Sequence, residues 1–150
     1  MEDLSLHILD VAENSIQASA TKIEIMITED KSKDLLVIRI KDNGRGMSEE
    51  TLCKVLDPFY TTRTTRRVGM GLSLLSQAAK ESNGSFEINS VIGEGTEVKA
   101  SFQYSHIDRK PMGDIKSTLI SLMISYPEIN IIFVHQDEDG TDIIDSNQLK

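Results

Sequence analysis

The stretch from Asp42 to Met47 holds residue types that could bind a flat, amine-bearing ligand. Asp42 ends an alternating apolar run, and Gly44 and Gly46 follow it in two-residue steps. Glycine lets the backbone turn sharply and approach a ligand closely. The carboxylate can accept a hydrogen bond from an exocyclic amine, such as that of adenine. An ordinary Asp-Asn-Gly hairpin turn would use the same residues, so this stretch alone leaves both interpretations open.

A row of polar side chains near the N-terminus could meet a metal ion or a ligand. His7, Asp10, Asn14 and Gln17 are spaced by three or four residues, which places them on one face of a helix. Asp10 and Asn14 offer oxygen atoms, the ligands that hard cations such as Mg²⁺ prefer. The row fits either a solvated face or a ligand-facing one. His7 by itself is more typical of a packing or surface residue than of a ligand.

Two later stretches could contact phosphate groups. The run from Gly69 to Leu72 opens a predicted helix, whose free N–H groups and dipole favour an anion. It is not a Walker loop, because no Gly-Lys-Ser/Thr follows. Residues 63–68 include three arginines, which is unusual in an acidic chain. They form either a solvated basic loop or a lid that brings positive charge to bound phosphates.

Hydrophobic periodicity predicts the elements that position these residues. Apolar residues of helical period predict a helix over 4–18, Ser48 caps a second helix that runs to about residue 55, and a third runs from Gly69 to near Asn83. Alternating runs predict strands, the first two antiparallel, over residues 22–28, 35–41, 85–90 and 96–104.

Residues 105–150 form a smaller unit that begins with a linker over 105–111. Apolar residues from Met112 to Tyr126 predict a helix, and strands are predicted over 129–135 and 141–145. About 40 residues are few for independent folding, so this α-β-β unit is expected to pack on the main sheet or on a partner. The same apolar surface is a candidate contact in a homodimer.

Composition narrows the classes of function. The chain has 150 residues, a net charge of −8 and a pI of about 4.8, which argue against non-specific binding to nucleic acid or to an anionic membrane. Cys53 is the only cysteine, so an internal disulfide and a multi-cysteine metal site are excluded. A reduced, cytoplasmic compartment is the simplest expectation. No apolar run approaches the roughly 20 residues that span a bilayer.

Five motifs follow one another along the chain: Asp10-x-x-x-Asn14, Asp42-x-Gly44-x-Gly46, Asp57-Pro58-Phe59-Tyr60-Thr61-Thr62, Gly69-x-Gly71 and Gly93-x-Gly95-Thr96. In this order they resemble the GHKL superfamily of ATP-binding domains (gyrase, chaperone, histidine kinase and MutL). The resemblance covers roughly residues 4 to 104 and is closest to MutL early in the chain and to sensor histidine kinases around residues 57–73. It implies an α+β, two-layer sandwich of the Bergerat type, with a mixed, mostly antiparallel sheet and helices on one face. Residues 1–104 would form this ATP-binding domain, and 105–150 the C-terminal extension.

The resemblance implies ATP and Mg²⁺ as cofactors and assigns a role to each matching position. Asn14 would hold the magnesium that bridges the phosphates, and Asp42 would accept from the adenine amine. Thr96 would support Asp42, in part through water. The remaining positions implied to bind the nucleotide are Gly44, Gly46, Met47, Thr61, Thr62, Arg63, Gly69, Met70, Gly71 and Leu72.

One position departs from the family pattern. Relatives that hydrolyse ATP place a glutamate four residues before the asparagine, and sensor kinases usually place a second asparagine there. This chain has Asp10, which could act as a shorter catalytic base or as a second magnesium ligand. A displacement of about 1 Å can lower a rate on the order of a hundredfold, so the difference matters for turnover.

Three hypotheses follow. The first is a stand-alone cytoplasmic ATP–Mg²⁺ domain, a kinase or ATPase that phosphorylates or changes shape for a separate, unidentified protein partner. It rests in part on the three residues ahead of the first helix, which leave no room for a helical phosphoacceptor segment. The second is an anti-sigma-like module that senses ATP without turnover. The third is an interaction domain whose pocket has decayed.

Overall fold

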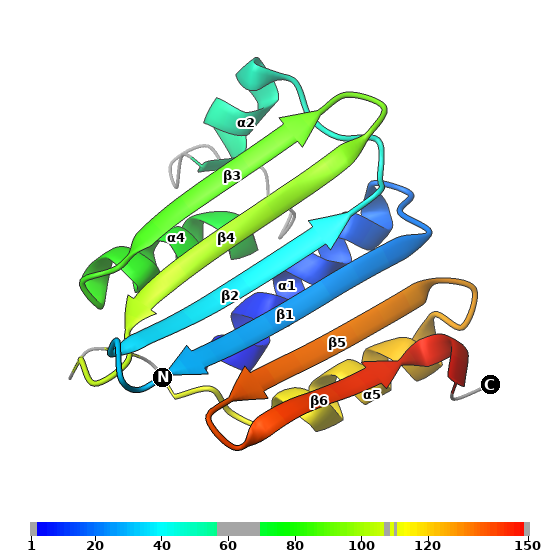
Figure 1. Ribbon diagram of the computed structural model, residues 1–150. Helices are drawn as coiled ribbons and strands as arrows, with labels where there is room; N and C mark the ends of the chain where they lie inside the picture. Colours follow the sequence, from blue (N-terminus) through cyan, green and yellow to red (C-terminus); the bar gives the residue numbers. More distant parts are fainter. Residues whose placement is uncertain (1–2, 57–69, 107–108, 110, 149–150) are drawn as a thin grey trace.

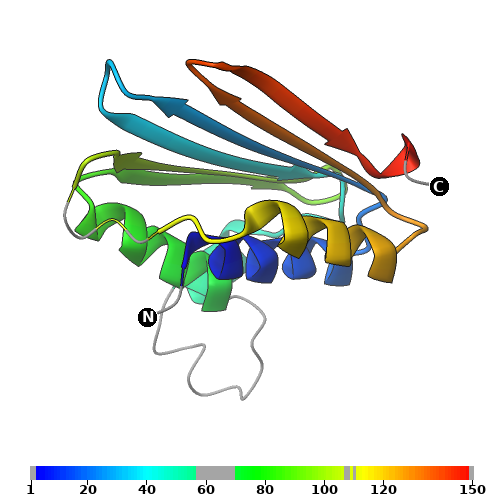
Figure 2. The same ribbon diagram turned by 90° about the horizontal axis from the view of Figure 1, so that it is seen from below.

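The computed structural model describes residues 3–56, 70–106, 109 and 111–148, and within them one six-stranded sheet carries its helices on a single face (Figures 1 and 2). The strand order is β3-β4-β2-β1-β5-β6. Strands β1 and β5 pair in parallel, and the other four neighbouring pairs are antiparallel. The predicted α+β class, with a mixed and mostly antiparallel open sheet, is therefore confirmed.

The described elements follow the predicted order closely. The helices are α1 (Leu4–Gln17), α2 (Glu49–Leu56), α4 (Met70–Glu81), α5 (Ile115–Ser125) and a short 3₁₀ helix, η1 (Ser146–Gln148). The strands are β1 (Lys22–Asp30), β2 (Leu35–Asp42), β3 (Ser85–Val91), β4 (Gly95–Gln103), β5 (Asn130–Asp137) and β6 (Gly140–Asp145).

One helix boundary differs from the prediction. The predicted helix includes Met112 and Tyr126, whereas α5 begins at Ile115 and Tyr126 is its C-cap. Gly113 has a φ of +77°, outside the helical region, and Asp114 follows as the N-cap. The Asp114 carboxylate accepts from the Ser117 N–H at 3.2 Å, which satisfies a helix-terminal donor and fixes the start of α5.

The core lies between the helices and one face of the sheet. Ile23, Ile25 and Ile27 of β1 are fully or almost fully buried, and the residues between them are more exposed. The same alternation in β2 buries Leu36, Ile38 and Ile40. Each such side chain contributes about 1.5–3 kcal/mol when it is fully buried. A one-residue shift in pairing would turn these rows out of the core, so the register of β1 and β2 is strongly specified.

The C-terminal strands extend the same sheet. β5 lies beside β1, with Lys22 opposite Asn130, and Figure 1 shows α5 behind the last two strands and running along them. The Asn130 N–H donates to the Thr21 carbonyl at 2.9 Å, and the Ile131 N–H donates to Ser146 Oγ at 2.7 Å. Residues from both ends of the sequence therefore meet at the start of β1.

Candidate functional site

A pocket opens where α1, the end of β2 and the start of β4 meet the first turn of α4. Its volume is about 490 Å³, within the range of sites that hold small molecules. Apolar and polar side chains share its walls. The lining residues are Val11, Asn14, Ser15, Gln17, Ala18, Ile40, Asp42, Arg45, Gly46, Met47, Ser48, Thr51, Leu72, Ile92, Thr96 and Val98.

The Asp42 carboxylate is held at the pocket wall by two hydrogen bonds. Its Oδ2 accepts from Ser15 Oγ at 2.6 Å, and its Oδ1 accepts from the Gly44 N–H at 2.8 Å. An ionised carboxylate has about four lone-pair positions, so two donors leave acceptor capacity for a ligand. Both donors are neutral, so neither cancels the negative charge. The arrangement presents an oriented acceptor to the pocket.

Thr96 and Met47 both line the pocket and share one hydrogen-bond partner, Ser90. Thr96 lies opposite Asp42 in the β2–β4 pairing, and its hydroxyl is 2.7 Å from Ser90 Oγ. The Met47 N–H donates to the same Ser90 oxygen at 2.7 Å. Ser90 therefore ties the loop after β2 to the β3–β4 hairpin and fixes one side of the pocket.

Two of the predicted glycines are required by close backbone approaches. A Cβ at Gly44 would lie 2.8 Å from the Ala18 carbonyl oxygen. Gly46 has a φ of +73°, and a Cβ there would overlap the Val91 carbonyl. Residues with side chains rarely adopt this φ, and the overlap would force the loop or β3 to move. The glycines therefore let the loop pack against α1 and β3.

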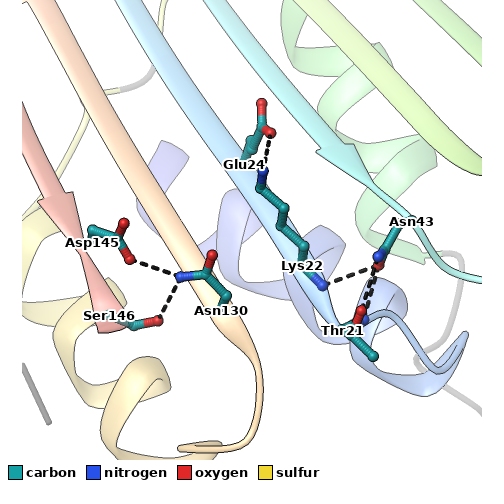
Figure 3. A network of polar contacts seen from close by, with 7 residues as sticks. All are labelled: Thr21, Lys22, Glu24, Asn43, Asn130, Asp145 and Ser146. Atoms are coloured by element: carbon teal, nitrogen blue, oxygen red, sulfur yellow. Dashed lines mark hydrogen bonds and ion pairs between the residues drawn. The ribbon is translucent and has the colours of Figure 1, made fainter. Parts of the chain in front are cut away.

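Asn43 fixes the same loop to the start of β1 (Figure 3). Its Oδ1 accepts from the Thr21 and Lys22 N–H groups at 2.8 and 3.0 Å, and its Nδ2 donates to Thr21 Oγ1 at 2.8 Å. The Arg45 N–H adds a bond to the Ala18 carbonyl at 2.9 Å. These bonds hold Asp42 and the glycine loop in place against the end of α1.

The predicted metal-ligand pair on α1 is only partly in the pocket. Asn14 is half-buried and lines the pocket, together with Gln17 one turn later. Asp10 is also half-buried, one turn before Asn14, but is not among the lining residues. His7 is 1% exposed and lies on the buried face of α1. The polar row is therefore neither a wholly solvated nor a wholly ligand-facing one.

The predicted phosphate-binding residues are described in part. Leu72, in the first turn of α4, is buried and lines the pocket. Met70 and Gly71 are the first two residues of that helix. Thr61, Thr62, Arg63 and Gly69, with the three-arginine stretch, lie outside the described residues.

Sequence reasoning missed Ser15, Ser90 and Asn43. Ser15 had a recognisable signal, because it continues the apolar row of Leu4, Ile8 and Val11, where a buried hydroxyl needs a partner. Ser90 and Asn43 had none, since their partners are set by tertiary contacts.

Comparison with known proteins identifies the family. Residues 2–106 match the model of the histidine kinase-, DNA gyrase B- and HSP90-like ATPases, and the chain belongs to this family. The resemblance to GHKL ATP-binding domains is thereby confirmed, and the domain is of the histidine kinase type.

Curated relatives include sensor histidine kinases. The chain is 34% identical over 106 residues to the sensor histidine kinase YxdK of Bacillus subtilis, a match that spans 66% of this chain and 32% of that protein. It is 32% identical over 88 residues to sporulation kinase C of the same organism, spanning 59% of this chain and 20% of the kinase. The chain thus matches about a third or less of each relative's length.

A solved structure shares the fold across nearly the whole chain. The MutL ATPase domain of Aquifex aeolicus, complexed with ADP, aligns with a TM-score of 0.56 and 22% identity. The alignment covers 97% of this chain and 63% of that domain. Among the described residues, no helix is both long enough and apolar enough to cross a bilayer.

Proposed function

We propose that the pocket binds ATP together with Mg²⁺ and that Asp42 accepts the hydrogen bond of the adenine amine. The observation that carries the proposal is the Asp42 carboxylate, which two hydrogen bonds hold in place at the pocket wall. Asp42 is oriented by Ser15 and the Gly44 N–H, keeps acceptor capacity, and faces a pocket of about 490 Å³. A purine exocyclic amine is a donor of matching chemistry.

The walls around Asp42 suit a purine ring. Val11, Ile40, Met47 and Val98 line the pocket with apolar side chains, which favour a flat aromatic ring over water. Gly46 keeps the loop close to β3, where any larger residue would displace it. The family match supports ATP as the nucleotide.

The part of the pocket between Asn14 and the first turn of α4 suits the phosphate groups of a nucleotide together with a magnesium ion. Asn14 lines the pocket and would contribute its side-chain oxygen to Mg²⁺, which needs few protein ligands when phosphates and water supply the rest. Leu72 places the first turn of the 12-residue helix α4 at the pocket edge. The N–H groups of such a turn have no acceptors within the helix and favour an anion.

We propose that the bound nucleotide acts on a separate protein, either by phosphoryl transfer or by a change of shape. The relatives named as kinases support the kinase form of this proposal. Of the chain's three histidines, His7 is buried in α1 and His135 contacts Glu29 at 2.7 Å, so neither is freely accessible as a phosphoacceptor.

A second candidate function is ATP sensing without turnover, as in an anti-sigma-like regulator. The observation that favours it is the position of Asp10, which lies outside the pocket lining and has a shorter side chain than the glutamate of hydrolysing relatives. A catalytic base must come within about 3 Å of the water that it activates, directly or through one water.

Calorimetric titration of the folded protein with ATP, with and without Mg²⁺, tests nucleotide binding. Asp42→Asn replaces an acceptor by an amide and is expected to lower the affinity by about 1–3 kcal/mol, or roughly 5- to 150-fold. Asp34→Asn is the matched control, because Asp34 precedes β2 and Asp42 ends it. Equal ATP affinity for wild type and Asp42→Asn would remove the assigned role.

Phosphate release and protein phosphorylation in the wild type and in Asp10→Ala separate the two functions. Turnover that falls at least about tenfold in Asp10→Ala, with unchanged ATP affinity, supports catalysis by that carboxylate. Tight ATP binding without turnover in either protein supports the sensing function.

A further inference from the structure

Three potential metal ligands meet at the end of the sheet that lies away from the pocket. Glu29 is the second-last residue of β1, beside the β1–β2 turn, and His135 and Asp137 are at the end of β5. One donor atom from each lies within 4.8 Å of the others. All three side chains are half-buried, with 22% exposure for Glu29 and 27% for His135. They are thus neither freely solvated nor sealed in the core.

The parallel register of β1 and β5 builds this cluster. Ile27 is opposite His135 and Thr28 is opposite Gln136, so the next position along sets Glu29 beside Asp137. Like charges opposite each other on adjacent strands are destabilising. His135 Nε2 already approaches Glu29 Oε2 at 2.7 Å. Two acids side by side in a half-buried position call for a compensating positive charge.

We propose that Glu29, His135 and Asp137 bind a divalent transition-metal ion of the zinc type. One imidazole nitrogen and two carboxylate oxygens suit Zn²⁺, Mn²⁺ or Fe²⁺, whereas Mg²⁺ prefers oxygen alone. Metal–ligand bonds of about 2.0–2.2 Å put donor atoms about 3–4 Å apart, so the observed cluster needs only small side-chain movements. Water completes the coordination on the exposed side.

The surrounding structure holds the cluster in position. The Lys31 N–H of the β1–β2 turn donates to the Glu138 carboxylate of the β5–β6 turn, which joins the two turns next to the site. The Asp139 N–H donates to Asp137 Oδ1 at 2.8 Å and orients that ligand. Figure 2 shows both turns curving away from the layer of described helices.

A neighbouring cation is already neutralised. Lys116 of α5 forms an ion pair with Asp142, the residue opposite His135 in the β5–β6 pairing. Its ammonium group is therefore matched by a carboxylate of its own and is not directed at Glu29 or Asp137. This site shares no residue with the ATP pocket.

Titration of the chelator-treated, nucleotide-free chain with ZnCl₂ tests the proposal. The expected result is one saturable Zn²⁺ per chain in the micromolar range or tighter, by calorimetry and by metal analysis after dialysis. His135→Asn, Glu29→Gln and Asp137→Asn are each expected to weaken binding at least about tenfold. Asp139→Asn, an exposed acid of the same turn, is the charge-matched control and should bind as wild type does.

A second measurement needs no variant. The His135 ring signals in an NMR spectrum of the wild type are expected to shift on Zn²⁺ addition and to return on chelation, while the His7 signals stay unchanged. Zinc that saturates without moving the His135 signals, or that binds all three variants as tightly as the control, would overturn the proposal. So would the lack of any saturable binding, which would leave a simple His135–Glu29 hydrogen bond.

Discussion

Carboxylates lie at both ends of the central strands, and their partners differ in kind. At the pocket end, the Asp42 carboxylate accepts from a hydroxyl and from a backbone N–H, and both donors are neutral. At the far end, Glu29 and Asp137 stand next to each other and next to an imidazole. The comparison teaches that the groups around a carboxylate determine which kind of ligand it can bind. Neutral donors orient it for a ligand's N–H group, whereas paired acids attract a cation.

The glycines of the two ends give the largest expected difference. Gly46→Ala adds both backbone strain and an overlap with the Val91 carbonyl, whereas Gly140→Ala, at φ +141° in the far turn, has nothing within 4 Å of the new Cβ. Strain alone costs about 1–3 kcal/mol. Urea unfolding should therefore show a larger loss of unfolding free energy for Gly46→Ala. Equal losses would mean that the pocket loop is not tightly packed.

Removing the Ser15 hydroxyl, which orients Asp42, is expected to lower ATP affinity by a smaller amount. Ser15→Ala removes the 2.6 Å bond to Asp42 and should weaken ATP binding by about 0.5–1.5 kcal/mol, because the carboxylate is less well oriented. Ser5→Ala is the matched control, since Ser5 lies in the same helix and donates to Asp3 at the same distance, 2.6 Å. Calorimetry with ATP should separate the two. A loss of affinity in both variants would point to α1 as a whole.

The smallest expected effect concerns Asp34, which immediately precedes β2 and whose carboxylate also accepts several hydrogen bonds. Hydrogen bonds from the Gln103 side chain and then from Ser105 lower the pKa of its carboxyl in the folded state. Its contribution to stability is therefore complete above the ordinary aspartate pKa of about 3.9 and is lost as the pH falls through the lower folded pKa. Asp34→Asn should reduce this acid-side dependence in thermal melts between pH 5 and about 2. Identical pH profiles would contradict the assignment.

Local patterns in the sequence predict most of the fold. Strands β1 and β2 alternate between buried and more exposed residues. Ser48 caps α2 as expected, since its Oγ accepts from the Thr51 N–H at 3.2 Å. Asp42 and its glycines are recognisable because an acid, a turn and close backbone approach all need particular residue types. The start of α5 was misplaced because Met112 fits the apolar period although Gly113 breaks the helix.

Contacts between distant residues could not be predicted in this way. The Ser15–Asp42 bond joins residues 27 apart, and Glu29 and His135 are 106 apart. The parallel pairing of β5 with β1 depends on the whole sheet, so no local pattern indicates it. The candidate metal site follows from that pairing alone, because Glu29 and His135 are unremarkable in their own strands.

The most direct test of the central claim compares ATP with inosine triphosphate, which lacks the exocyclic amine, in calorimetric titrations of wild type and Asp42→Asn. If Asp42 accepts from that amine, wild type should bind ATP more tightly by about 1–3 kcal/mol. Asp42→Asn should lose most of this preference while Asp34→Asn retains it. Equal affinity of the wild type for the two nucleotides would contradict the claim that this carboxylate recognises adenine.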